Sequence, residues 1–196
     1  TSQAETEALG IRVGDFVAFD PLPEFTRNGY ISARHLDNKA GAAALLTTIK
    51  QVVDSGELLP MDCHPIFTIT EETGTGSAGA LPWDVSEFVG VDIAPTAPGQ
   101  NSTEHSVTLC MQDSGGPYDF HLTQHLQSLC QRDAIPMRRD LFRYYHSDAE
   151  SAIRSGTDTR IALIGFGTDA THGYERTHRD SLEALSRLLL AYVYSP

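Results

Sequence analysis

The stretch YISARHLDNKAGAAALLTTIKQVV, residues 30–53, decides the class of fold that this sequence predicts. It opens as a β-strand, and from Asn38 to Val53 its Ala- and Leu-rich spacing is that of a helix, with Gly56 as a stop. The same strand-to-helix alternation recurs to the end of the chain. Alternation of this kind indicates an α/β fold in which a layered, largely parallel sheet carries helices on both faces.

The remaining strands and helices are expected where apolar runs and helical spacing follow one another. We expect strands at 65–69, 88–91, 105–111, 138–145 and 160–165, and helices at 118–134, 147–156 and 179–194. The runs 65–69 and 88–91 contain no charged residue, so both strands are expected to be buried in the sheet.

Residues 1–29 differ from the rest of the chain. Residues 11–19 alternate apolar and polar around a Gly-Asp turn, which is typical of a β-hairpin, and Asp20-Pro21-Leu22-Pro23 follows as a linker. A lone hairpin is marginal in water. We therefore interpret 1–29 as the remnant of a small β domain and 30–196 as the main α/β domain.

Composition and charge exclude several classes of function. The 196 residues hold 14 Lys and Arg against 26 Asp and Glu, a formal charge of −12, which argues against nucleic-acid and anionic-membrane partners. The longest apolar runs, such as 188–193, are too short to cross a bilayer. The chain has 3 widely spaced cysteines, which suggests reduced thiols in a cytoplasmic protein.

Four short clusters place a carboxylate or an imidazole at the end of a predicted strand or the start of a helix. They are Leu36–Gly41, Thr70–Gly74, Val91–Asp92 and Thr171–Glu175. Open α/β sheets bind ligands in the crevice outside the carboxyl ends of their strands. Carboxylates and an imidazole gathered there, with a spare glutamate, predict a hydrolytic site that uses two divalent metals.

Each acidic residue also has a simpler interpretation. Asp37 could serve only as a helix N-cap, and Asp92 could form a turn at a strand end. Glu71 and Glu72 could be solvated loop acids. Against the loop interpretation, the two glutamates are followed by a run of small residues that lets the backbone approach neighbouring groups closely. This run is Gly74-Thr75-Gly76-Ser77-Ala78-Gly79. A dinucleotide fingerprint over that run is disfavoured because the paired glutamates would repel a pyrophosphate.

The clusters together resemble the M42 family of metallo-aminopeptidases, the glutamyl aminopeptidase and cellulase-M-like group. Residues 10–15 resemble the end of the family's inserted dimerisation domain, and 36–41 resemble the stretch that carries its metal-bridging aspartate. Residues 70–74 resemble the general-base segment, 91–92 a further ligand, and 172–175 the closing histidine motif. That last motif is one residue tighter than the family's, so His172 and His178 both remain candidate ligands.

The resemblance implies an aminopeptidase with two metal ions per full-length chain, zinc or cobalt. Asp37 would bridge the metals, Glu72 and His172 would complete one site, and Asp92 would complete the other with an upstream histidine. Glu71 would be the general base, and Glu175 a possible partner of His172. Because that upstream histidine is absent here, we expect the 196-residue chain alone to be folded but inactive. The full-length protein is expected to be a cytoplasmic homo-oligomer.

Two alternatives stay open. The same metals and acids would serve an amidohydrolase that removes the acyl group from small N-acyl amides, so the substrate is either a peptide or a small amide. A non-catalytic protein that kept the fold is the third possibility, although such a protein would not need a base at Glu71.

Overall fold

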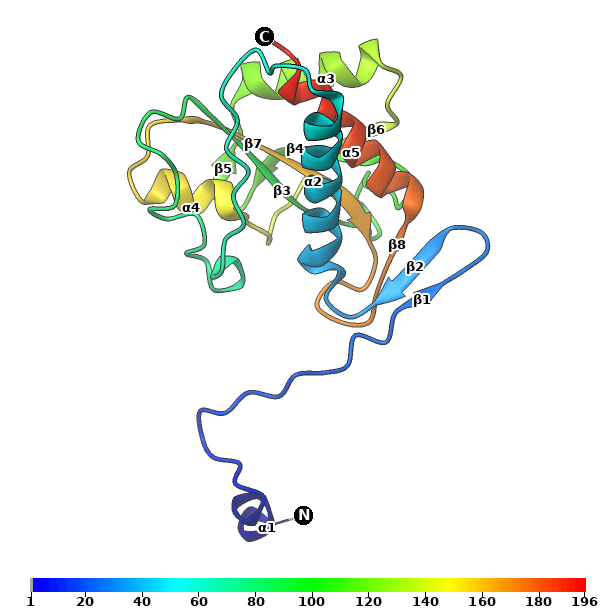
Figure 1. Cartoon of the computed structure of the whole chain (residues 1–196). Coiled ribbons are helices and arrows are strands. Elements are labelled where there is room, and N and C mark those ends of the chain that lie inside the picture. Colours follow the sequence, from blue (N-terminus) through cyan, green and yellow to red (C-terminus); the bar gives the residue numbers. More distant parts are fainter. Residues whose placement is uncertain (1) are drawn as a thin grey trace.

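A mixed five-stranded sheet forms the centre of the computed structural model, which describes residues 2–196 (Figure 1). The strands follow the order β3-β7-β4-β5, and β6 pairs with β4. Their bounds are β3 Glu87–Pro95, β4 Val107–Asp113, β5 Gly116–Pro117, β6 Met137–Leu141 and β7 Arg160–Thr168.

The longer pairings of this sheet are parallel. β3 runs parallel to β7 along its whole length, from Glu87 opposite Arg160 to Pro95 opposite Thr168, and β6 runs parallel to β4. β4 is antiparallel to β7 and to the short β5. The predicted α/β class with a mostly parallel sheet is therefore confirmed.

Helices cover both faces of the sheet because its strands bury apolar residues on each side. Ile164 and Phe166 of β7 belong to the larger core cluster, which includes residues of α2 (Leu36–Ser55), α3 (Phe120–Arg132) and α5 (Arg179–Val193). Leu163, directly before Ile164 in sequence, packs in a second cluster with Ala149 of α4 (Asp148–Arg154). This alternation is the period-2 pattern of a strand buried on both faces.

The predicted helices form close to their expected ends. α2 stops at Gly56, which takes the left-handed conformation with φ 68°, and the hydroxyl of Ser147 caps α4 by accepting a hydrogen bond from the amide of Ala149. Among the described residues, no helix combines the length and the apolar character that crossing a membrane would need.

A small antiparallel sheet, which the sequence pattern did not indicate as a unit, lies beside the large one. It consists of β1 (Glu24–Phe25), β2 (Tyr30–Ala33) and β8 (Glu175–His178), in the order β1-β2-β8. The register places Ala33 opposite Glu175 and Tyr30 opposite His178. This pairing brings the start of α2 next to the loop that carries His172.

The hairpin predicted over residues 11–19 is wrong. The first described element is the short helix α1 (Gln3–Ala8), and residues 9–23 form no strand, with α1 and the residues after it lying away from the body (Figure 1). Val13 and Phe16 in this segment are exposed. A hairpin needs a third strand or a helix to cover its apolar face, and none of the described residues covers this one.

The buried strand predicted over 65–69 is also wrong. Those residues are extended but make no ladder pairing, and the side chain of Ile69 is 97% exposed. The single-turn helix η1 (Glu71–Thr73) follows at once. An apolar run forms a β-strand only where the edge strand of a sheet is available to pair with it. The sequence of the run does not show whether such an edge strand is present.

Candidate active site

The side chains of Asp37, Glu72 and His172 converge at one point although they come from three distant parts of the chain. His172 Nε2 lies 3.4 Å from Asp37 Oδ2 and 3.3 Å from Glu72 Oε2. One potential ligand atom of each residue lies within 4.8 Å of the other two, which makes the group a candidate metal site. Three of the four predicted ligands are thus brought together.

Asp37 is placed by an irregular start to α2. Its backbone is not helical, with ψ 111°, and none of the hydrogen bonds of the described residues runs from a helix amide to its carboxylate. Asp37 is therefore not the simple N-cap that was one interpretation of it. The next residue anchors the turn, because Asn38 Nδ2 donates to the carbonyl of Val91 at 2.6 Å. A side chain at Gly41 would collide with Asn38, since a Cβ there would lie 2.1 Å from its Oδ1.

The buried carboxylate of Glu175 holds the backbone on both sides of the cluster. Its Oε2 accepts from the amide of Asp37 at 2.9 Å, and its Oε1 accepts from the amide of His172 at 2.9 Å. Glu175 is only 1% exposed, whereas the His172 side chain is 70% exposed. Sequence analysis expected Glu175 to support His172, and the structure shows contact through the backbone rather than the imidazole.

His178, the rival ligand, lies outside this cluster. It ends β8, where its Nε2 contacts the carbonyl of Asn28 at 2.7 Å and its Nδ1 accepts from the amide of Asp180 at 3.1 Å. The structure therefore selects His172 over His178 as the imidazole that faces Asp37 and Glu72.

Asp148, which sequence analysis did not single out, fixes the loop that carries Glu71 and Glu72. Its Oδ2 accepts from the hydroxyl of Thr68 at 2.5 Å, and its Oδ1 accepts from the amide of Ser77 at 3.0 Å. A Cβ on Gly76 would lie 2.4 Å from Asp148 Oδ1. The glycine-rich run thus allows the close approach that its small residues predicted. The Ser147 capping signal marks the start of α4 but not the contact of Asp148 with this loop.

Asp92 lies deeper than the group of three. It is 5% exposed, and its Oδ1 accepts from the amide of Ile93 at 2.7 Å. Burial raises its pKa well above the usual range, and the nearby carboxylates of Asp37 and Glu71 raise it further. The buried hydroxyl of Tyr145 lies against Asp92, which together with burial raises the pKa of that tyrosine. Asp92 therefore belongs to the same electrostatic site.

Burial and mutual repulsion raise the pKa values of Asp37 and Glu71 as well. Burial, Glu72 and Glu175 raise the pKa of Asp37 to about 6. Burial, Asp148, Glu72 and Asp37 raise the pKa of Glu71 to about 7. A divalent cation would relieve both causes, and carboxylates with an imidazole are a donor set that such cations accept. The residues present therefore fit a metal centre.

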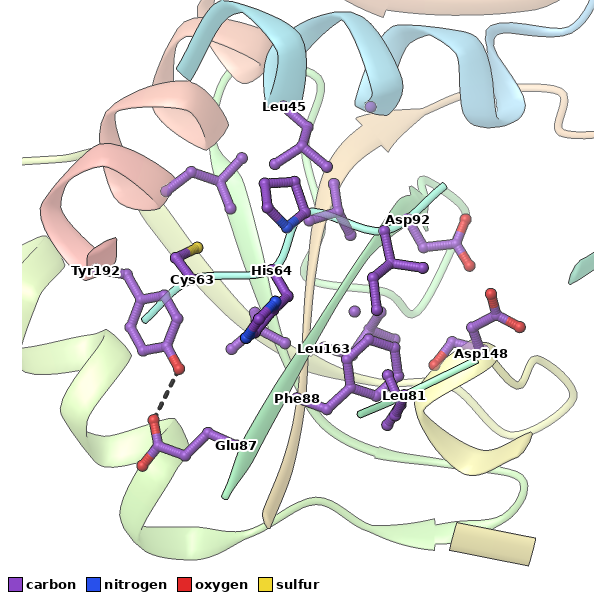
Figure 2. A pocket seen from close by; sticks show the side chains of 18 of the residues that line it. Leu45, Cys63, His64, Leu81, Glu87, Phe88, Asp92, Asp148, Leu163 and Tyr192 are labelled. Atoms are coloured by element: carbon purple, nitrogen blue, oxygen red, sulfur yellow. Dashed lines mark hydrogen bonds between the residues drawn. The ribbon is translucent and has the colours of Figure 1, made fainter. Parts of the chain in front are cut away.

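The carboxylates lie where two hollows meet. The larger hollow, of about 1200 Å³, is bounded by α2, β3 and the extended residues 61–69, and the smaller, of about 560 Å³, is bounded by the His172 loop and Phe19. Asp37 and Glu72 line both. Figure 2 shows Asp92 and Asp148 at one side of the larger hollow, with Phe88 and Leu163 along its wall. Its volume exceeds the roughly 300–1,000 Å³ of typical small-molecule pockets, so the hollow has room for a short peptide.

The family profile described as M42 glutamyl aminopeptidase matches residues 1–188. The chain belongs to the M42 glutamyl aminopeptidase family. The "Putative aminopeptidase YhfE" of Bacillus subtilis (strain 168) is 43% identical over 192 residues, which make up 98% of this chain and 56% of that protein. This M42 chain therefore spans just over half the length of that relative.

Solved structures share the fold of this M42 chain. A TET aminopeptidase from the archaeon Thaumarchaeota archaeon SCGC AB-539-E09 has a TM-score of 0.83 at 22% identity, with 99% of this chain and 57% of that one covered. The TET1 peptidase of Pyrococcus horikoshii has a TM-score of 0.80 at 21% identity, with 98% and 58% covered. At this identity the likeness shows that the fold is the same.

We predict that Glu175→Gln weakens metal binding by about 10–100-fold, the range seen when a residue that supports metal ligands is changed. The amides of Asp37 and His172 bind different oxygens of Glu175, and in glutamine an NH2 donor replaces one of these oxygens, so one of the two amides would face a donor. Metal titration of the native protein measures the effect. Glu183→Gln, an exposed glutamate on α5, is the matched control. Equal metal affinity in the two variants would contradict the role given to Glu175.

We predict that the metal-free protein becomes less stable as the pH rises from about 4 to about 7. Asp37 and Glu71 have folded-state pKa values of about 6 and about 7, above the ordinary 3.8 and 4.5. A carboxyl whose pKa is raised by folding stabilises the fold below its unfolded pKa, and that stability is lost as the pH rises through the folded pKa. Thermal unfolding in a chelator across this range measures the slope, and Asp37→Asn should flatten it.

Proposed function

We propose that this chain contributes the catalytic residues of a metal-dependent aminopeptidase that removes N-terminal residues from peptides. One observation carries the proposal: Asp37, Glu72 and His172 offer converging ligand atoms, with the carboxyl group of Glu71 beside them. Family membership makes this chemistry the expected one for the arrangement.

Asp37, Glu72, Asp92 and His172 would hold two divalent metals, zinc or cobalt. Asp37 is assigned the bridging position because its carboxylate faces Glu72 and His172 on one side and raises the pKa of the buried Asp92 on the other. Divalent metals held by these residues would supply a strongly acidified water and polarise the scissile carbonyl.

Glu71 is assigned the role of general base. Its side chain is half-buried and its pKa is raised to about 7, which is where a group that both takes and returns a proton near neutral pH works best. Its carboxylate would take the proton of the attacking water and pass it to the leaving amine, a contribution of about 10²–10⁴ in rate. Asp148 holds the loop so that this carboxylate stays in place.

The charge of the larger hollow favours a substrate with a free α-amine over an N-acyl amide. Eight carboxylate side chains line this hollow, whereas Lys39 and Arg160 are the two lysine or arginine residues among the described residues that line it. An ammonium group is attracted to such a surface, whereas an acylated nitrogen carries no charge. The acidic lining is Asp37, Asp62, Glu71, Glu72, Asp84, Glu87, Asp92 and Asp148.

We extend the proposal to the organisation of the whole protein. Residues 30–196 would be the catalytic α/β domain, and 1–29 the end of an inserted dimerisation domain. The Pyrococcus horikoshii TET1 peptidase, which shares the fold, can assemble into a tetrahedron or a large octahedral shell. A homo-oligomer in the cytoplasm is the corresponding proposal for this protein.

We predict opposite effects for the two adjacent glutamates. Glu71→Gln should keep the metals but reduce turnover by about 10²–10⁴-fold, because the amide cannot take a proton. Glu72→Gln should lose metal at one site. Elemental analysis and steady-state kinetics on the native protein separate the two effects. If Glu71→Gln lost metal and Glu72→Gln kept it, the two roles would be exchanged.

We predict that the native protein hydrolyses peptides with a free α-amine and leaves their N-acetylated counterparts intact. The two peptides differ by one acetyl group, which removes the charge of the terminal nitrogen, so the comparison tests whether a free α-amine is required. Hydrolysis of small N-acyl amides, with intact free peptides, would identify a deacylase. Inactivity on both in a metal-loaded preparation would favour the non-catalytic alternative.

A further inference from the structure

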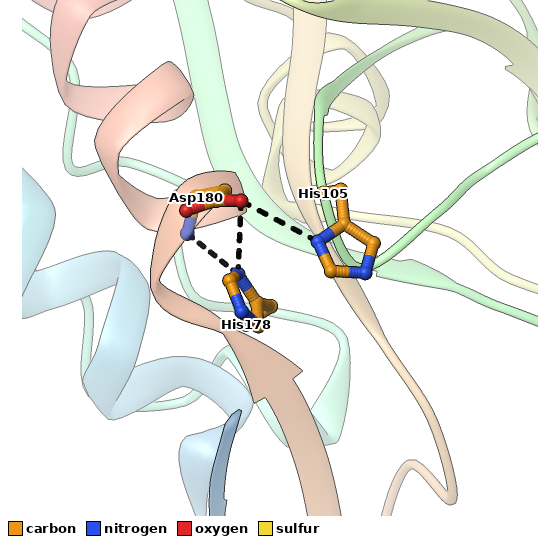
Figure 3. Close-up of side chains that lie close together, drawn as sticks. All are labelled: His105, His178 and Asp180. Atoms are coloured by element: carbon orange, nitrogen blue, oxygen red, sulfur yellow. Dashed lines mark hydrogen bonds and ion pairs between the residues drawn. The ribbon is translucent and has the colours of Figure 1, made fainter. Parts of the chain in front are cut away.

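A second cluster of metal-ligating side chains shares no residue with the candidate active site. It consists of His105, which precedes β4, and His178 and Asp180 at the start of α5 (Figure 3). Asp180 Oδ2 lies 3.2 Å from His178 Nδ1 and 3.5 Å from His105 Nδ1. One ligand atom of each residue lies within 4.8 Å of the others.

The far nitrogen of each imidazole already has a partner, so Nδ1 faces the centre of the cluster, where that of His178 accepts a hydrogen bond from the amide of Asp180. His178 Nε2 lies 2.7 Å from the carbonyl of Asn28, and a carbonyl only accepts, so this nitrogen carries the proton. In the neutral ring the lone pair is then on Nδ1. His105 Nε2 lies 3.3 Å from the hydroxyl of Tyr30. Histidines that bind metals commonly use their second nitrogen in this way, to fix the ring and its tautomer.

The backbone also holds the His178 ring in this orientation. A Cβ on Gly29 would lie 2.5 Å from His178 Nε2, so only glycine lets the loop lie against the ring. Tyr30 packs edge-on against the same ring with centroids 4.9 Å apart. His178 is 5% exposed, whereas the side chains of His105 and Asp180 are about half exposed, at 50% and 49%. The cluster is therefore preorganised on its inner side and open to solvent on its outer side.

The two distances from Asp180 to the imidazoles fit a tetrahedral ion. Ligand atoms about 2.0–2.1 Å from zinc lie about 3.3–3.4 Å from one another in a tetrahedron. The two contacts of Asp180 Oδ2, at 3.2 and 3.5 Å, bracket that value. Its other oxygen lies 3.8 Å from Nε of Arg179, whose exposed side chain does not enter the group.

We propose that His105, His178 and Asp180 form a binding site for a zinc-class divalent ion, with the fourth position left to water. Two imidazoles and one carboxylate are ligands that zinc and its neighbours accept. Binding replaces one hydrogen bond, because the amide of Asp180 now donates to His178 Nδ1 at 3.1 Å. The ion would tie together the loop before β4, the end of β8 and the start of α5.

The test removes metal binding at the candidate active site first. In an Asp37→Asn, His172→Gln background, ZnCl₂ titration should show one ion bound per chain, and CoCl₂ should give the visible absorption of tetrahedral cobalt. Adding His105→Gln, or Asp180→Asn, should weaken this binding at least tenfold. Both positions are half exposed, so the fold should persist, and circular dichroism checks that it does.

His121→Gln in the same background is the matched control, because His121 is an exposed histidine outside both clusters. It should leave zinc binding and the zinc-induced rise in Tm unchanged, and His105→Gln should abolish that rise. The proposal is overturned if the background variant binds no zinc. It is also overturned if folded His105→Gln and Asp180→Asn bind zinc as tightly as the control.

Discussion

The carboxylate of Glu175 is the contact on which the candidate active site depends. It is buried, and its two oxygens receive the amides of Asp37 and His172, which are far apart in sequence. The pairing of β2 with β8 places it there, because Ala33 lies opposite Glu175 and the irregular start of α2 follows Ala33 closely. A buried carboxylate is costly unless its oxygens are hydrogen-bonded, and here the same bonds that satisfy it set the distance between two candidate ligands.

The site gathers more negative charge than the fold alone would favour. The pKa values of Asp37, Glu71 and Asp92 are all raised, in each case first by burial and then by neighbouring carboxylates. This repulsion opposes folding as the groups ionise. The same field attracts divalent cations and a substrate ammonium group, so the charge that weakens the metal-free fold also selects what binds. The hydrogen bonds from Thr68 and Ser77 to Asp148 keep the loop of Glu71 in place against that repulsion.

Patterns that depend on neighbouring residues were predictable from the sequence, and those that depend on a distant partner were not. The helix that ends at Gly56 and the apolar strand around Val91 follow from local spacing, and both are present. The run 65–69 has the composition of a strand but pairs with no edge in the described chain. β8 has no apolar alternation and forms because β2 lies beside it. Likewise, the candidate ligands follow from residue type and order, whereas the role of Asp148 depends on a contact 71 positions away in sequence.

The short strand β8 connects the two clusters of candidate ligands. Glu175 at its start fixes the backbone of Asp37 and His172, and His178 at its end faces His105 and Asp180. An ion at the second cluster would restrain one end of a strand of only 4 residues, whose other end supports the active-site ligands. Because every residue of β8 pairs with β2, a restraint on His178 also limits movement of Glu175. An ion bound by His105, His178 and Asp180 would therefore influence the geometry of the candidate active site through the small sheet.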